Sequence, residues 1–230
     1  DYAKIGIGRS TGTKLISASG HIKNPGVYEI EMGLSVYEFM NSDEYLGGMS
    51  SDRPLKAFIP GGSSVPVLPA HLIYKTANNE DRLMTYESLS DGGFATGSML
   101  GSGGFIVYDD TSCIVRNTWN FARFYHHESC GQCSPCREGT GWMEKVLHRI
   151  ENGHGREEDI DLLLSIQSKI EGNTICPLGD AAAWPVAAAI RHFRDEFEYH
   201  IRFPEKIKNR DHFVAEPFEK VKHLVSKVIV

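Results

Sequence analysis

Four cysteines constrain the fold of this chain more than any other feature of its sequence. Cys130, Cys133 and Cys136 are spaced two residues apart, and Cys176 follows far downstream, directly before Pro177. The total of five cysteines is odd, which argues against a set of disulfides and favours thiolates that hold a metal. A short loop can wrap three corners of an iron-sulfur cubane, and a distant thiolate then completes the site. The spacing therefore predicts that Cys130, Cys133, Cys136 and Cys176 bind one 4Fe-4S cluster.

Zinc is the alternative occupant of four thiolates. Zinc ribbons usually present two separated C-x-x-C pairs, whereas this chain presents a triplet and a single distant cysteine. The spacing favours the cluster, and a zinc-stabilised interaction module without a redox role is the alternative. We interpret His126 and His127 as helix-surface or supporting groups, and Cys113 as a small buried hydrophobic residue instead of a fifth ligand.

Positive charge accompanies the predicted ligands. Pro177 opens a helix directly after Cys176, and the N-terminal dipole of a helix favours an anion. Arg137, beside Cys136, either adds a fixed positive charge to the site or forms a solvated pair with Glu138 or Glu144. The dipole and the charge would both raise the reduction potential of a bound cluster.

The sequence pattern changes near residue 110. Before it, two strand-like runs within 13–31 flank an Asn-Pro-Gly turn, and further strands are predicted at 55–60 and 104–108, with a short helix at 34–40. This region predicts a small unit with a mixed sheet. After it, apolar residues recur at helical spacing, with Trp142 and Trp184 expected in the core. Four helices are predicted there, at 113–130, 137–152, 157–171 and from 177 towards 201. We therefore predict an α+β fold that ends in a four-helix bundle.

Charge and hydropathy exclude several classes of function. The chain has 24 Lys and Arg against 30 Asp and Glu, a net charge of -6, so it lacks the basic surplus that nucleic acid binding requires. No stretch is long and apolar enough for a membrane span, and no secretory leader is recognisable. Because residue 1 is Asp and a Gly-rich stretch follows directly, we expect a fragment of a longer polypeptide. Gly6 and Gly8 do not fit G-x-G-x-x-G and are interpreted as a domain-boundary turn.

The cysteine segments also resemble a known family. ESCGQCSPCREGTGWM at 128–143, IEGNTICPLGDAAAWPV at 170–186 and HFRDEFEYHI at 192–201 are similar to the NADH-binding flavoprotein subunit of respiratory complex I, an NADH:quinone oxidoreductase. GTKLISASGHIKNPGVYE at 12–29 and IPGGSSVPVLP at 59–69 resemble the soluble ligand-binding β-grasp module of that family. Pro177 is a local departure, since Ala is more usual after the fourth cysteine.

The resemblance implies a division of the chain and a role for it. Residues 1–11 would be the remnant of an upstream FMN- and NADH-binding domain, 12–110 a β-grasp-like domain, 111–203 the helical 4Fe-4S-binding bundle, and 204–230 a tail that lies along a neighbour. The implied function is electron transfer: FMN takes a hydride from NADH, and the cluster passes electrons towards quinone in the respiratory chain. FMN and NADH belong to the full-length flavoprotein, so we expect this chain alone to lack both sites and not to oxidise NADH.

The implied partners are the missing N-terminal flavin domain and the other peripheral-arm subunits of complex I. The implied location is cytoplasmic, peripheral to the inner membrane through the complex. A diaphorase subunit of a soluble NAD-linked hydrogenase or formate dehydrogenase is the alternative within the same resemblance. The absence of further cysteine clusters in the sequence favours the complex I subunit.

Overall fold

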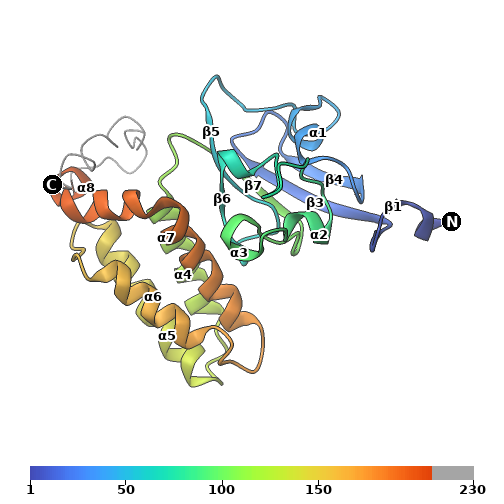
Figure 1. Ribbon diagram of the computed structural model, residues 1–230. Coiled ribbons are helices and arrows are strands. Elements are labelled where there is room, and N and C mark those ends of the chain that lie inside the picture. Colours follow the sequence, from blue (N-terminus) through green and yellow to red (C-terminus); the bar gives the residue numbers. More distant parts are fainter. Residues whose placement is uncertain (209–230) are drawn as a thin grey trace. The chain divides into compact units, whose positions relative to one another are not determined.

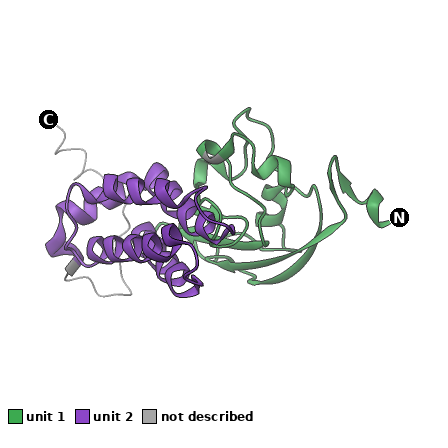
Figure 2. Ribbon diagram, turned by 90° about the horizontal axis from the view of Figure 1, so that it is seen from below, with its two compact units in different colours: residues 1–110 green, residues 111–230 purple. Residues whose placement is uncertain are grey.

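The chain divides into two compact units, Asp1–Asp110 and Thr111–Val230 (Figure 2). The computed structural model describes residues 1–208. The first unit is built around a sheet and the second contains the long helices (Figure 1). The mixed α and β composition predicted from the sequence is therefore confirmed. The tail prediction for residues beyond 208 lies outside the described residues.

The first unit contains a five-stranded sheet with the order β4-β3-β7-β5-β6. The pairing of β3 with β7 is parallel and the other three pairings are antiparallel, so the sheet is mixed as expected. Its strands are β3 (Thr13–Gly20), β4 (Gly26–Glu31), β5 (Leu55–Ile59), β6 (Leu68–Pro69) and β7 (Gly104–Asp109). Short helices accompany them: η1 (Tyr2–Lys4), α1 (Val36–Asn41), η2 (Ala70–Leu72), α2 (Tyr86–Leu89) and α3 (Gly93–Thr96).

Buried and exposed side chains alternate along the β3–β4 hairpin, so the hairpin buries one of its two faces. Ile16 and Ile30 are buried, whereas Leu15 and Val27 on the same two strands are exposed. Because successive side chains point to opposite faces of a sheet, this pattern places one face of the hairpin on the core. Three phenylalanines of that core are fully buried and contact one another in a chain: Phe39, Phe105 and Phe58.

The Gly-rich start of the chain forms a small hairpin of its own. Strand β1 (Gly6–Ile7) pairs antiparallel with β2 (Ser10–Thr11). Gly8 between them has a φ of 60°, a left-handed conformation that glycine adopts without strain. The turn predicted for this stretch is therefore present at Gly8. The sequence did not predict the two short strands on either side of it.

The second unit contains four long helices and one short one within the described residues. They are α4 (Ile114–Glu128), α5 (Ser134–Glu151), α6 (Asp159–Ile170), α7 (Leu178–Arg202) and α8 (Pro204–Lys208). Helix α5 begins three residues before the predicted start, since Pro135 fits the first turn, where a backbone N–H has no helical partner. Pro204 was predicted to end the last helix, and it also begins α8.

Neither of the two tryptophans predicted to lie in the core is fully buried. Trp142 is 54% exposed, so its assignment to the core was wrong. It lines an apolar groove of about 700 Å³ between α5 and α6, together with Leu162 and Val146. Trp184 is partly buried, and its indole N–H donates to Glu171 at 2.9 Å. Helical spacing placed both residues on the helices but did not determine which face each helix buries.

Candidate metal centre

The cysteine triplet spans the junction between α4 and α5. Cys130 is exposed and follows Ser129, the C-cap of α4. Cys133 is the N-cap of α5 and is partly buried, and Cys136 is buried in the first turn of that helix. The triplet therefore combines a loop with the N-terminus of an 18-residue helix, whose dipole favours negative charge.

Hydrogen bonds within the loop fix its shape. Gly131 has a φ of 78°, the left-handed conformation that lets the chain turn sharply between Cys130 and Cys133. The Arg137 guanidinium donates to the carbonyl of Gly131 at 2.9 Å and pairs with Glu138 at 2.9 Å. Both roles expected for Arg137 from the sequence therefore coexist: it pairs with a neighbouring carboxylate and it holds its charge beside the loop.

The fourth cysteine belongs to a turn that contacts the triplet. Cys176 is exposed and directly precedes Pro177, the N-cap of α7. The backbone N–H of Ile175 donates to the Sγ of Cys133 at 3.4 Å. This contact brings the Cys176 turn to the start of α5, as the predicted site requires. The sequence gives no signal for this contact of Ile175, because a backbone N–H donor does not depend on residue type.

A second thiol contact was also missed. The hydroxyl of Ser129 lies 3.2 Å from the Sγ of Cys136 and also accepts from the N–H of Gly131 at 3.3 Å. Hydrogen bonds to cluster sulfurs are one of the means by which a protein adjusts the potential of an iron-sulfur centre. The position of Ser129, directly before the first cysteine, was the one feature of the sequence that could have indicated this contact.

A zinc ion and a 4Fe-4S cluster require different separations between their thiolate ligands. Tetrahedral zinc with Zn–S bonds of about 2.3 Å needs its sulfurs about 3.8 Å apart. Within residues 1–208, the one group of three donors within 4.8 Å of one another is made of other residues, and the four predicted ligands do not form such a group. A cubane is broader than one ion and takes one thiolate at each iron, so its ligands need not form such a compact group.

The histidines near the triplet have other contacts. His126 packs against Gly141 of α5, where an added Cβ would lie 2.9 Å from its Nε2. His127 is exposed and pairs with Glu128 at 3.0 Å. Their interpretation as surface and supporting groups agrees with these positions. Cys113 is a different case: it is the N-cap of α4, at the helix end remote from the triplet, and it contacts polar groups there.

Most of the helical unit matches a family model. Residues 116–200 match the NADH-ubiquinone oxidoreductase-F iron-sulfur binding region. All four predicted cysteine ligands lie inside the matched segment of the iron-sulfur binding region. The resemblance stated from the sequence is therefore confirmed, and a 4Fe-4S cluster is the cofactor that the matched region supports.

Similar proteins extend the match beyond the iron-sulfur binding region. The chain is 46% identical over 209 residues to the F subunit of NADH-quinone oxidoreductase from Rickettsia typhi, and the alignment covers 90% of this chain and 45% of that protein. It is 42% identical over 200 residues to the corresponding F subunit from Mycobacterium bovis, covering 87% of this chain and 42% of that protein. The chain thus spans somewhat less than half the length of these relatives.

Two solved structures of similar fold are those of a hydrogenase in different states. The air-oxidized NAD+-reducing [NiFe]-hydrogenase matches with a TM-score of 0.71 and 28% identity, covering 87% of this chain and 32% of that chain. The H2-reduced state matches with a TM-score of 0.71 and 26% identity, covering 98% of this chain and 34% of that chain. The architecture of this chain is therefore shared with part of an NAD-linked redox enzyme.

Proposed function

We propose that this chain is the electron-transfer part of the flavoprotein F subunit of an NADH-quinone oxidoreductase, and that it acts as one segment of that oxidoreductase. The observation that carries the proposal is the iron-sulfur family match over 116–200, which encloses the cysteine triplet and Cys176. When bound, a 4Fe-4S cluster supplies one-electron transfer. In the whole flavoprotein, the donor would be FMN reduced by NADH, and the acceptor side would lead towards quinone.

The proposed ligands are Cys130, Cys133, Cys136 and Cys176. Support comes from the Ile175–Cys133 hydrogen bond, which joins the two cysteine segments, and from the buried position of Cys136. Cys130 and Cys176 are exposed, so the site lies at the surface of the helical unit. A surface position suits a centre that exchanges electrons with a neighbouring domain or protein.

We also propose the finer division of the chain made from the sequence. The division is 1–11 as the end of a flavin domain, 12–110 as a β-grasp-like domain, 111–203 as a four-helix bundle and 204–230 as a tail. The division into units at residue 110 and the packing of α4, α5 and α7 on one another support it. The four helices would serve as the rigid frame that holds the thiols.

The proposed partners are the flavin domain of the whole protein and other peripheral-arm subunits of complex I. The relatives at 42–46% identity are named as subunits of NADH-quinone oxidoreductase, which supports assembly into a multi-subunit enzyme. Within residues 1–208, no helix combines the length and apolar character needed to cross a membrane. The proposed location is the cytoplasmic side of the inner membrane, reached through the complex.

A diaphorase subunit of an NAD-linked hydrogenase or formate dehydrogenase is the second candidate. The match to NAD+-reducing [NiFe]-hydrogenase favours it, with a TM-score of 0.71. The identity of 28% to the hydrogenase is well below the 46% to the NADH-quinone oxidoreductase relative, so the complex I assignment is preferred. Co-purification of the native protein with quinone-reducing activity or with hydrogen-oxidising activity distinguishes the two.

The ligand assignment is tested by replacing each cysteine with serine in turn. Cys176→Ser should leave a degraded centre with less iron and an altered reduced-state EPR spectrum, because one corner of the cubane loses its thiolate. Cys113→Ser is the matched control, since Cys113 lies at the other end of α4, and it should keep the iron content and the spectrum. An unchanged cluster in the Cys176 variant rules out the proposed ligand set. Zinc in place of iron and acid-labile sulfide in the wild-type chain would favour the zinc-stabilised interaction module instead.

A further inference from the structure

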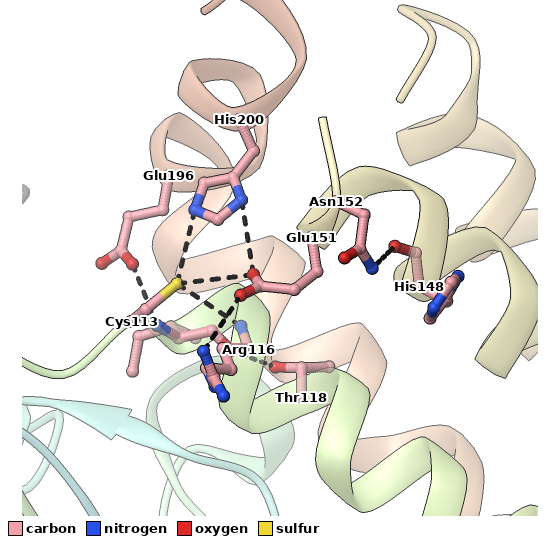
Figure 3. Close-up of polar contacts among 9 residues, drawn as sticks. Cys113, Arg116, Thr118, His148, Glu151, Asn152, Glu196 and His200 are labelled. Carbon is pink, nitrogen blue, oxygen red and sulfur yellow. Dashed lines mark hydrogen bonds and ion pairs between the residues drawn. The ribbon is translucent and has the colours of Figure 1, made fainter. Parts of the chain in front are cut away.

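A second set of metal donors lies where three helix ends meet (Figure 3). Cys113 is the N-cap of α4, Glu151 is the last residue of α5, and His200 lies in the last turn of α7. One donor atom from each of the three side chains lies within 4.8 Å of the other two. We propose that Cys113, Glu151 and His200 bind a zinc ion, at a site separate from the cluster cysteines.

The separations between the donors are close to those of a zinc site. The Sγ of Cys113 lies 3.3 Å from Nε2 of His200 and 3.9 Å from Oε2 of Glu151. The other ring nitrogen of His200, Nδ1, lies 3.5 Å from the same carboxylate oxygen. Only one nitrogen of the imidazole can bind the ion, and one ligand atom from each side chain lies within 4.8 Å of the other two. Ligands of tetrahedral zinc, at bond lengths of about 2.0–2.3 Å, stand about 3.3–3.8 Å apart. Small rotations of these side chains would therefore place all three ligand atoms at bonding distance from one ion.

The chemistry of the three donors selects zinc from the common divalent ions. Zinc accepts thiolate, imidazole and carboxylate together, whereas magnesium and calcium prefer oxygen ligands alone. Glu151 is 8% exposed and His200 is 3% exposed, so both lie largely out of water. Two negative ligands and one neutral imidazole balance the charge of a divalent cation, which offsets the cost of burying a carboxylate and a thiolate.

Neighbouring groups hold two of the donors in place. The other carboxylate oxygen of Glu151, Oε1, lies 4.0 Å from the Arg116 guanidinium, which leaves Oε2 turned towards Cys113. The backbone N–H of Arg116 donates to the Sγ of Cys113 at 3.4 Å, and Glu196 accepts from the N–H of Ile114 at 3.0 Å. Outer contacts of this kind orient ligands and are important for metal affinity.

The proposed zinc site and the cysteine site occupy opposite ends of the same helices. Helix α4 has Cys113 as its N-cap and ends at Glu128, two residues before Cys130, whereas α5 has Cys133 as its N-cap and ends at Glu151. At 1.5 Å per residue, the 15 residues of α4 span about 22 Å, so the two sites cannot share an ion. Zinc would tie the ends of α4, α5 and α7 together, and its binding free energy would stabilise the helical unit.

The test uses the full 230-residue chain with its iron-sulfur complement reconstituted. The chain is loaded with Zn²⁺, dialysed, and assayed for zinc and iron by elemental analysis, and zinc K-edge absorption gives the ligand atoms. We expect about one retained zinc per chain, with one sulfur and two or three nitrogen or oxygen neighbours. This measurement on the wild-type chain does not depend on whether any variant folds.

Variants then assign the ligands. Cys113→Ser, Glu151→Gln and His200→Gln should each weaken zinc binding on the order of 100-fold while iron content is kept. His127→Gln, at a histidine whose side chain is 85% exposed, is the matched control and should retain zinc. A shell of four sulfurs, a failure to retain zinc, or undiminished binding in the three ligand variants would each overturn the proposal.

Discussion

The backbone N–H of Ile175 donates a hydrogen bond to the Sγ of Cys133, at 3.4 Å, across 42 positions of the sequence. The contact joins the turn before α7 to the start of α5. Because Cys133 and Cys176 belong to the proposed cluster site, the same two segments would also be joined through the cluster. We therefore expect folding of the helical unit to be coupled to occupation of the site, since a metal site that joins distant segments adds its binding free energy to folding.

Removal of the cluster is expected to loosen the helical unit selectively. After chelation of the iron, amide hydrogen exchange should accelerate at 129–137 and 173–182, where the thiols lie. The sheet unit, Asp1–Asp110, contributes none of the proposed ligands and should keep its exchange rates. Equal loss of protection in both units, or none in either, would contradict the coupling.

The charge of Arg137 is expected to raise the reduction potential of the cluster. Arg137→Gln removes a cation whose guanidinium donates to Gly131 in the ligand loop, so the oxidised, less negative cluster is favoured. We expect the midpoint potential to fall on the order of 20–60 mV, measured by EPR-monitored redox titration. Glu138→Gln is the matched control: it removes the partner of Arg137, keeps the cation, and should move the potential upward or not at all.

The sequence predicted the helix start at Pro177 and the family of the cysteine segments because both signals are local. The C-x-x-C-x-x-C spacing also predicts the ligand set. The helices of the second unit were predicted to within a few residues, since apolar periodicity and glycine stops both act within one turn.

The features that the sequence did not predict depend on contacts between distant segments. Cys113 was interpreted as a small hydrophobic residue, yet its thiol lies 3.3 Å from His200, 87 positions away. Trp142 has helical spacing with core residues, but only the packing of α6 decides that its side chain lines a groove. Arg82, whose side chain is fully buried, gave no signal in the sequence because its partners are all backbone carbonyls.

Tyr108 is expected to make the sheet unit sensitive to alkaline pH. Burial raises the pKa of Tyr108 above its ordinary value of 10.0. The neutral phenol is therefore favoured in the folded state, and its contribution to stability is complete below pH 10 and is lost as the pH rises above it. The unfolding free energy should fall by up to about 1.4 kcal/mol per pH unit from this group.

Tyr108→Phe tests that expectation because phenylalanine does not ionise. Its unfolding free energy should decline less steeply between about pH 9.5 and about 11 than that of the wild-type chain, measured by denaturant titration of the sheet unit. Tyr37→Phe, at a side chain that is 61% exposed, is the matched control and should follow the wild-type profile. Parallel profiles for the Tyr108 variant and the wild type would refute the assignment.

Gly20 and Gly48 differ in what surrounds them and should differ in their tolerance of alanine. Both have positive φ, 95° and 85°, a conformation that costs alanine about 1–2 kcal/mol. At Gly48 an added Cβ would meet open space, whereas at Gly20 it would collide with the backbone carbonyl oxygen of Val107 in β7. Gly20→Ala should therefore lower the free energy of unfolding by at least about 2 kcal/mol more than Gly48→Ala does. Urea unfolding, with amide exchange in β3 and β7, measures the difference. Equal losses would show that β3 and β7 can separate without cost.

Arg82 is expected to be irreplaceable by lysine. Its guanidinium donates to five backbone carbonyls, those of Leu72, Lys75, Ser88, Leu89 and Thr96. A lysine ammonium has three donors on one nitrogen and cannot reach carbonyls arranged around a planar fork. Arg82→Lys should lower the unfolding free energy by about 2–4 kcal/mol, because at least two of these carbonyls lose their donor.

The matched control for Arg82 is Arg53→Lys. Arg53 pairs with Asp110 at 3.2 Å and its side chain is 47% exposed, so the charge can be kept by lysine with a change of less than about 1 kcal/mol. Both variants keep the net charge of the chain, which leaves donor geometry and burial as the differences between them. If the two lysine variants unfold at the same denaturant concentration, the buried fork of Arg82 does not hold the loops around α2 and α3 together.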